Sequence, residues 1–431
     1  MSVATGSVTP SSAPIELEKA VVRNWKPPIG LGIFALIGIL LFVVFARPGA
    51  TSFRFSTDGD QIQIPIWVVD AGAVYIVVTI LLIAIAAVSA FLAYRARRTP
   101  IWLIAVFAAL FMFGFLTWAA AGASLPVQIA SLLVGAVSLS VPLVFGALGG
   151  VISERVGVVN VAIEGQLLAG AFVSALVASA TGMQFLGLLA AMVAGVLVSF
   201  VLAAFSIKYF VDQVIVGVVL NVLVVGLTSF LFSTLLAPNA ALLNSPPRFD
   251  RIEIPLLSQI PIIGPVFFRQ TIIVYLVYIA VFVVWFALFK TRWGLRLRSV
   301  GEHPQAADTV GINVARTRFW NVSLAGAIAG LGGAYYTLGS VGAFNKEMTA
   351  GAGFIALAAV IFGRWDPIRA TLAALLFGFA LNLQYALSVI GSPVPSEFML
   401  MVPYLVTIFA VAGLVGYVRG PAAAGKPYVK S

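Results

Sequence analysis

A few polar side chains stand inside long apolar runs, and these residues are the best placed to bind a ligand. Asn160 and Glu164 lie four positions apart near the start of one run, so a helix would bring both to one face. An ionised group within a bilayer is costly unless it is paired or wet, and such groups are often functional. Either this face lines a path and hydrogen-bonds a polar substrate, or Glu164 accepts from backbone N–H groups and holds a broken helix in shape.

Three amides occupy similar positions in later apolar runs. An amide donates and accepts hydrogen bonds without carrying a charge, which suits an uncharged polar ligand. The alternative is that these amides join neighbouring helices, an interaction worth about 0.6 kcal/mol each in membrane proteins. The full set of candidates for a substrate path is therefore Asn160, Glu164, Asn221, Asn382 and Gln384.

A second feature is the polar, basic segment 290–318, which separates two apolar runs. Pro304 can occupy the first turn of a short helix. Ala306 and Ala307 would give that helix a small-residue face that another protein can approach closely, and Gly311 would let the chain leave by a left-handed turn. Such a helix, lying along a membrane, could receive motion from a docked protein. The other interpretation is a solvated loop whose charges only set the topology.

Composition places these elements in a membrane. The chain has 431 residues, of which 61% are hydrophobic and 9% are charged, and its mean hydropathy is +1.09. Soluble domains carry roughly 45–50% apolar and about 25% charged residues. Because apolar runs of about 20 residues recur along the chain, we predict an all-α polytopic membrane protein.

About twelve runs qualify as membrane segments. Their predicted bounds are 29–46, 67–94, 101–121, 127–148, 161–181, 185–207, 214–236, 271–289, 319–338, 352–363, 370–389 and 398–418. The run at 352–363 is too short to cross a bilayer alone, so we expect it to be re-entrant or extended by its glycine-rich flank.

The distribution of positive charge predicts the orientation. With the N-terminus in the cytoplasm and the spans alternating, nineteen of the 25 Lys and Arg residues fall on the cytoplasmic side. Both termini are then cytoplasmic, and Glu154 and Arg155 lie at the inner mouth of a span, where water could solvate them. Because this bias accounts for the net charge of +10, we predict no nucleic-acid partner.

The predicted organisation has five parts. A polar cytoplasmic N-terminus covers 1–28, an additional pair of spans covers 29–100, and a ten-span core covers 101–418. The segment 290–318 is a cytoplasmic loop within that core. A basic cytoplasmic tail follows at 419–431.

Several kinds of chemistry are excluded by residue content. The chain has no cysteine and one histidine, His303 in the polar loop, so it has neither a thiolate nucleophile nor a His-based metal site within the membrane. The tail from Gly420 to Pro427 nearly spells a phosphate-binding loop, but Pro427 replaces the required Ser or Thr and no strand precedes it. We therefore predict no catalytic residue, no cofactor and no metal.

Three sequence blocks carry a family resemblance. SERVGVVNVAIEGQLLAGAF at 153–172 resembles a signature of guanosine-type nucleoside ABC-importer permeases. VGEHPQAADTVGIN at 300–313 and GAGFIALAAVIFGRWDP at 351–367 resemble blocks of permeases for ribose-type sugars, nucleosides and branched-chain substrates. The positions that depart from the usual Ser, Met and Glu are Val156, Gln166 and Gln305.

The resemblance implies the permease subunit of a nucleoside importer that works by alternating access in the bacterial cytoplasmic membrane. It implies three partners: a cytoplasmic ATPase that uses the ATP, a second homologous permease, and an extracellular substrate-binding lipoprotein. The residues that would couple to the ATPase are Gly301, Glu302, Pro304, Gln305, Ala306, Ala307 and Gly311. One alternative is a simple-sugar permease of the ribose type. Another is a proton- or sodium-coupled transporter that uses Glu164 as its coupling carboxylate.

Overall fold

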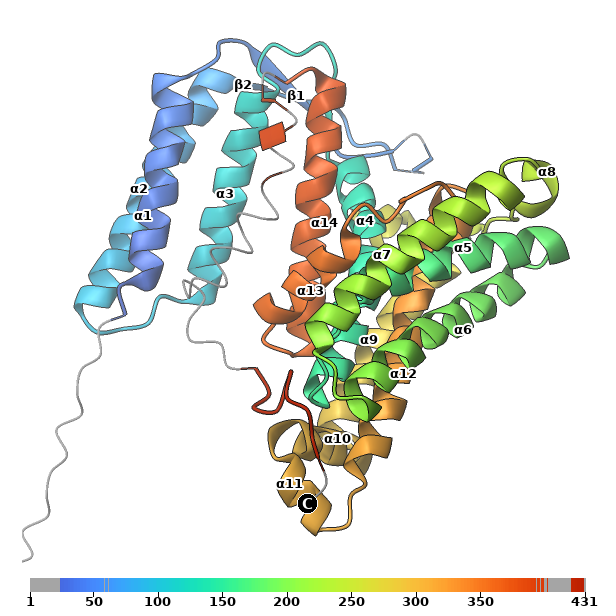
Figure 1. The fold of residues 1–431 in the computed structure, drawn as a ribbon. Coiled ribbons are helices and arrows are strands. Elements are labelled where there is room, and N and C mark those ends of the chain that lie inside the picture. Colours follow the sequence, from blue (N-terminus) through green and yellow to red (C-terminus); the bar gives the residue numbers. More distant parts are fainter. Residues whose placement is uncertain are drawn as a thin grey trace, which may run out of the picture. The chain divides into compact units, whose positions relative to one another are not determined.

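The computed structural model describes residues 24–57, 59–60, 62–392, 394–395, 397–398, 401 and 420–429. The chain divides into two compact units. The smaller unit contains Met1–Gly49 and Asp70–Trp118, and the larger contains Ala50–Val69 and Ala119–Ser431. Helices make up most of both units (Figure 1). The predicted run 398–418 falls almost entirely outside the described residues and stays a prediction.

The smaller unit is built from three apolar helices. Helix α1 covers Lys26–Ile39 and continues as a π-helical turn at Leu40–Val44, α2 covers Ala71–Tyr94, and α3 covers Ile101–Ala119. Each is long and apolar enough to span a membrane. The predicted additional pair of spans, 29–100, therefore corresponds to α1 and α2.

Aromatic packing and a helix cap order this unit. Phe42, which is 1% exposed, stacks on Tyr75 with ring centroids 5.9 Å apart. A side chain at Gly114 would collide with Phe42, so the small residue on α3 is needed for this contact. Asp70 starts α2, because its carboxylate accepts a hydrogen bond from the Ala73 N–H at 2.9 Å.

The larger unit contains the remaining described helices. In chain order they are α4 Ile129–Arg155, α5 Ile163–Thr181, α6 Gln184–Ala203, α7 Gln213–Leu231, α8 Ala240–Leu243, α9 Ile272–Lys290, α10 Arg292–Glu302, α11 Pro304–Thr309, α12 Val314–Ala334, α13 Ala352–Phe362 and α14 Pro367–Ile390. Three of them, α6, α7 and α12, continue as π-helical turns at Ala204–Lys208, Phe232–Leu236 and Tyr335–Ser340.

Small residues bring α12 into the centre of this unit, against α4, α5 and α6. A side chain added at Gly195 of α6 would collide with the backbone of Gly326, and one added at Gly333 would collide with the backbone of Leu167. Such close approach is how membrane helices associate without a hydrophobic driving force. The glycine-rich segment at the end of α12 is therefore a packing element.

Short strands form a three-stranded sheet at one end of the larger unit. Strand β1, Ala50–Arg54, lies between β2, Trp67–Asp70, and β3, Val127–Gln128. The pairing of β1 with β3 is parallel, with Phe53 opposite Val127. The segment between α1 and α2 is thus joined to the start of α4.

A two-stranded antiparallel sheet completes this end. Strand β4, Arg251–Glu253, pairs with β5, Arg269–Thr271, immediately before α9. We call the region that carries these sheets the strand end of the larger unit. The opposite region, which carries α10 and α11, is called the α10–α11 end (Figure 1).

The predicted membrane segments agree well with the helices. Among the described residues, nine helices are long and apolar enough to cross a membrane, and they coincide with nine predicted runs. They are α1 with its π-helical turn, α2, α3, α4, α5, α6, α7, α9 and α14. The runs 319–338 and 352–363 correspond to α12 with its π-helical turn and to the short α13. The chain is thus a multi-spanning helical membrane protein.

One expectation about local structure was wrong, and one element was not predicted. Residues 67–70 form strand β2 rather than the start of a span, because they pair with β1. The segment 290–318 contains α10 as well as the expected short helix. Thr291 starts α10 by accepting the Gly294 N–H at 3.2 Å, a capping signal that charge and hydropathy do not reveal.

Candidate functional site

Glu164 lies in the first turn of α5 and is 7% exposed. Its carboxyl group accepts hydrogen bonds from the Thr349 hydroxyl at 2.6 Å and from the N–H groups of Gly351 and Gly353 at 2.9 and 2.6 Å. These donors stand at the start of α13, where unsatisfied N–H groups and the helix dipole favour a carboxylate. Glu164 therefore caps a helix other than its own, as the clamp interpretation requires.

Two glycines allow this cap to form. Gly351 has a φ of +84°, a left-handed conformation that side chains other than glycine rarely adopt. A side chain at Gly353 would collide with the backbone of Glu164. The glycine-rich flank of the predicted short run thus lets α13 begin directly beside α5.

Asn221 of α7 holds the start of α5 from the other side. Its Oδ1 accepts from the Gly165 N–H at 2.8 Å, and its Nδ2 donates to the Val161 carbonyl at 2.9 Å. The side chain is 6% exposed. One amide therefore satisfies backbone groups on both sides of the first turn of α5, a local clamp rather than simple contact between helix faces.

Asn160 does not share a helix face with Glu164, and that expectation was wrong. Helix α5 begins at Ile163, so Asn160 lies in the turn that follows α4. Its amide exchanges two hydrogen bonds with Gln166, at 3.1 and 3.2 Å, and Gln166 also donates to Ser199 at 3.0 Å. All three side chains are fully buried. Asn160 and Gln166 thus form a structural pair within the core.

Glu164 and Asn221 line a cavity of about 380 Å³ between α5, α7 and the start of α13. Its other lining residues are Val218, Val222, Val225, Glu347, Thr349, Ala350, Gly351 and Phe354. Small-molecule sites are usually apolar cavities of about 300–1,000 Å³ with a few placed polar groups. The cavity combines aliphatic walls and one aromatic face with a carboxyl group and an amide.

Asn382 and Gln384 do not line the cavity at Glu164. Asn382 donates to the Leu132 carbonyl at 2.7 Å and lines a separate cavity of about 240 Å³ with Tyr385. The Gln384 Oε1 is buried without a hydrogen-bond partner among the described residues. The five predicted polar residues therefore do not converge on one site, and only Glu164 and Asn221 line a common cavity.

Glu154 is buried at the end of α4, 4% exposed, so the expected solvated position was wrong. Its carboxyl group accepts from the Trp365 indole N–H at 2.5 Å, and Arg155 Nε donates to the Trp365 carbonyl at 2.9 Å. Arg364 and Trp365 have φ angles of 56° and 55°, which are uncommon and strained for residues with side chains. Sequence reasoning missed Trp365, although it stands in the block at 351–367.

Helices α10 and α11 carry the residues predicted to couple to another protein. Pro304 occupies the start of α11, and Gly311 leaves the turn beyond it with a φ of +84°, as expected. Ala306 is exposed, but Ala307 is 3% exposed and packs into the core, so the small-residue face is narrower than predicted. A side chain at Gly301 would collide with the Arg155 carbonyl, so α10 rests directly on the end of α4.

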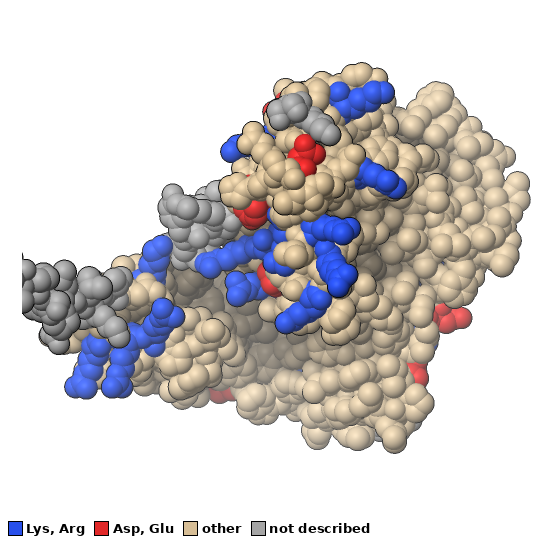
Figure 2. Space-filling view, turned by 90° about the horizontal axis from the view of Figure 1, so that it is seen from below, with Lys and Arg blue, Asp and Glu red and all other residues tan. Residues whose placement is uncertain are grey.

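Lys and Arg side chains gather on this surface (Figure 2). Those contributed by the segment 290–318 are Lys290, Arg292, Arg296, Arg298 and Arg316. Pro304 and Gly311, which define α11, thus lie in a strongly basic segment.

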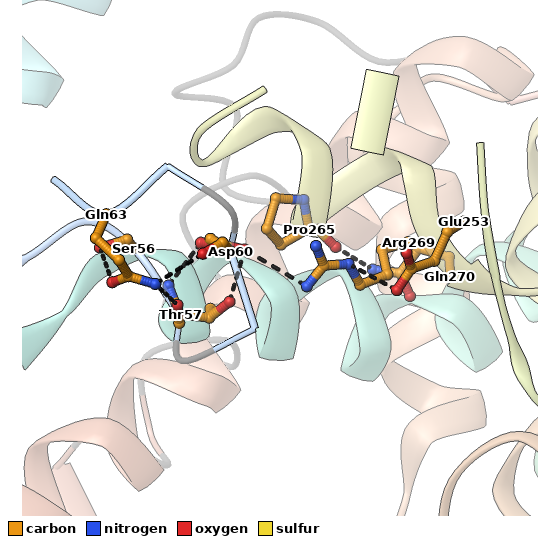
Figure 3. Close-up of polar contacts among 8 residues, drawn as sticks. All are labelled: Ser56, Thr57, Asp60, Gln63, Glu253, Pro265, Arg269 and Gln270. Atoms are coloured by element: carbon orange, nitrogen blue, oxygen red, sulfur yellow. Dashed lines mark hydrogen bonds and ion pairs between the residues drawn. The ribbon is translucent and has the colours of Figure 1, made fainter. Parts of the chain in front are cut away.

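At the strand end, Arg269 lies between two carboxylates (Figure 3). Its Nη1 is 3.5 Å from an Asp60 oxygen, and its Nε is 3.2 Å from a Glu253 oxygen. Asp60 also accepts from the N–H and hydroxyl of Thr57, at 2.6 and 2.8 Å. Arg269 thus joins the segment between α1 and α2 to the β4–β5 hairpin.

Comparison with protein families gives one match, which covers most of the larger unit. The model of a family described as "Branched-chain amino acid transport system / permease component" matches residues 132–411. The match thus includes the cavity at Glu164, the α10–α11 end and α14. It begins after the smaller unit.

Similar proteins include two with nucleoside names. The guanosine ABC transporter permease protein NupQ of Bacillus subtilis is 44% identical over 318 residues, which are 70% of this chain and 98% of that protein. The nucleoside ABC transporter permease protein NupC of Lactococcus lactis is 41% identical over 305 residues, 68% of this chain and 94% of that protein. A putative glucose ABC transporter permease protein, TsgC13 of Haloferax volcanii, is 37% identical over 59% of this chain and 77% of that protein. No solved structure matches the chain significantly.

Proposed function

The chain belongs to the family of permease components of branched-chain amino acid transport systems, and we propose that it is the membrane-spanning subunit of an ATP-driven nucleoside importer. The observation that carries this proposal is the 44% identity to a guanosine permease over 98% of that protein's length. A putative glucose permease is less similar, at 37% over 77% of its length, so a simple-sugar substrate is the second choice.

The α10–α11 end is the cytoplasmic face in this proposal. When the predicted spans alternate, nineteen of the 25 Lys and Arg residues fall on the cytoplasmic side, and those of the segment 290–318 are among them. Both termini would then be cytoplasmic, in the cytoplasmic membrane of a bacterium. The strand end, with Arg269 and its two carboxylates, would face outward.

A separate ATPase would dock on α10 and α11. Among the residues predicted to couple, Gln305 and Ala306 are exposed, and Gly311 ends the segment in open space. Gly301 contacts the end of α4, so a push on α10 reaches a long helix directly. A second homologous permease would complete the pathway, and an extracellular lipoprotein would deliver substrate to the strand end.

The cavity at Glu164 and Asn221 is the proposed place for substrate within this chain. Phe354 offers an aromatic face, and Asn221 and Glu164 offer groups that can hydrogen-bond to ribose hydroxyls or base edges. Glu164 already accepts three hydrogen bonds at the start of α13. It therefore serves as a fixed cap beside the substrate.

Uptake of radiolabelled guanosine tests the proposal, in cells that express the permease with its ATPase, second permease and lipoprotein. Adenosine, uridine and ribose serve as competitors, and an ATPase variant that cannot hydrolyse ATP serves as the control. We expect uptake that requires ATP hydrolysis and is displaced by nucleosides before ribose. Uptake that continues without ATP hydrolysis and collapses with a protonophore would contradict the proposal.

A further inference from the structure

The described part of the C-terminal tail, residues 420–429, lies against the α10–α11 end of the larger unit (Figure 1). The Ala423 N–H donates to the Gly301 carbonyl at 2.9 Å, and the Ala422 N–H donates to the Glu302 carboxylate at 3.2 Å. Ala423 is only 4% exposed. Two consecutive tail residues are thus bonded to the last two residues of α10.

Arg318, near the start of α12, binds the same tail. It is 2% exposed, and its Nη1 donates to the Lys426 carbonyl at 3.0 Å. Its Nε and Nη2 have no hydrogen-bond partner among the described residues. Burying a charge is costly unless it is paired and hydrogen-bonded, so the carbonyl supplied by the tail matters for this guanidinium.

The tail also reaches two turns that connect long helices. A side-chain carbon at Gly425 would lie 3.7 Å from Val159, in the turn between α4 and α5. One at Gly420 would lie 3.0 Å from the Trp365 ring, in the turn between α13 and α14. These are the turns that hold Asn160 and the strained Trp365, so the tail borders both.

Near its end, the described tail contacts α11. Tyr428 lies beside the Asp308 carboxyl group. Desolvation and then the neighbouring carboxyl group raise the pKa of Tyr428 above its ordinary value, so the phenol stays uncharged beside Asp308. The tail is therefore hydrogen-bonded to α10 and α12 and lies beside α11.

We propose that residues 420–429 form a strap that holds α10 and α11 in position, so that motion of these two helices reaches the turns at Val159 and Trp365. Each contact named above joins the strap either to a residue of the segment 290–318 or to one of the turns at Val159 and Trp365. The strap residues act by positioning, because they lie at the α10–α11 end and none lines the cavity at Glu164. This proposal rests on the proposed function, since the α10–α11 end is where the ATPase would act.

The test uses the whole importer complex in proteoliposomes and measures nucleoside molecules imported per ATP hydrolysed. Two variants release the strap: a chain that ends at Gly420, and Ala423→Phe, which cannot fit the buried position. Ala422→Phe is the matched control, because its side chain is exposed and its backbone N–H is kept. We expect the first two to lower the import-to-hydrolysis ratio by about fivefold or more, and the control to change it less than about twofold.

An unchanged ratio in the strap variants would overturn the proposal, and so would a loss confined to the amount of assembled complex. Failure of the proposed function looks different, because the unaltered complex would then show no ATP-dependent nucleoside import.

A second measurement does not depend on the substrate. The chain has no cysteine, so spin labels at Ala306→Cys and Arg369→Cys report the distance from α11 to the start of α14. We expect this distance distribution to broaden when the strap is removed. An identical distribution would count against the strap.

Discussion

Helix α13 is held by a buried carboxyl group at each of its ends, and the two groups are satisfied to different degrees. At its start, Glu164 accepts from one hydroxyl and two backbone N–H groups. Beyond its far end, Glu154 accepts from the Trp365 indole alone, among the hydrogen bonds of the described residues. Both carboxyl groups are nearly inaccessible, at 7% and 4% exposure.

The difference shows that burial alone does not determine how much a carboxyl group contributes to the stability of a helix end. The donors around Glu164 belong to a helix start, where the dipole also favours negative charge. Glu154 has one neutral donor on a turn whose backbone is strained at Arg364 and Trp365. We therefore expect the start of α13 to depend strongly on its carboxylate and the far end to depend on it weakly.

Replacing Glu164 gives the largest expected effect. In Glu164→Gln, the amide keeps one acceptor oxygen but turns an NH₂ group toward a backbone donor. We expect a loss of about 2–4 kcal/mol in the free energy of unfolding, since buried donors lose a charged acceptor. Thermal unfolding of the purified permease in detergent measures it. A Glu164→Gln protein as stable as the unaltered one would show that the cap is dispensable.

The same substitution at Glu154 tests whether the two ends of α13 depend differently on their carboxyl groups. In Glu154→Gln the amide oxygen can still accept from Trp365, and a buried charge is removed. We expect the stability to change by less than about 1 kcal/mol in either direction. The same thermal measurement applies. If Glu154→Gln costs more than Glu164→Gln, the ranking of the two ends of α13 is reversed.

The Thr349 hydroxyl isolates one of the three donors to Glu164. Thr349 is 3% exposed, and valine has nearly the same shape without the hydroxyl. We expect Thr349→Val to cost about 1–2 kcal/mol, because Glu164 keeps its two backbone donors. Thr349→Ser, which keeps the hydroxyl, should be the less harmful change. Equal losses in the two variants would assign the effect to packing.

Among these carboxyl groups, Glu253 is the one whose replacement should change the stability least. Its side chain is 61% exposed and lies 3.2 Å from Arg269, so water screens the ion pair. We expect Glu253→Gln to change the stability by less than about 0.5 kcal/mol. A larger loss would mean that the strand end depends on its ion pairs as much as the helix core depends on its caps.

Hydropathy predicted the long helices well because a bilayer imposes their length and composition. The residue type predicted the turn at Gly311, because a left-handed φ favours glycine. The short elements were harder to predict from the sequence. Helix α10 starts from the Thr291 hydroxyl, and β2 exists only because β1 is beside it.

The candidate site was predicted only in part. A clamp role for Glu164 was one of two alternatives, because a carboxylate within a span needs donors, but its donors lie about 185 positions further along the chain. The pattern of one segment cannot show such a partner. For the same reason Asn160 was assigned to a helix face, whereas its side chain is paired with Gln166 in a turn. Trp365 and the docked tail were missed because their partners are also distant in sequence.

Transport by two glycine variants tests the central claim, that an ATPase drives nucleoside import through α11. Gly311 and Gly182 both have positive φ, at 84° and 68°, and both have open space around them. Gly311 follows α11, whereas Gly182 follows α5. Leucine at either position meets the same left-handed strain.

The measurement is ATP-driven guanosine import by the reconstituted complex, at matched amounts of permease. We expect Gly311→Leu to lower import by about tenfold, while Gly182→Leu stays within about twofold of the unaltered protein. Equal effects of the two substitutions, or no ATP-driven guanosine import at all, would contradict it.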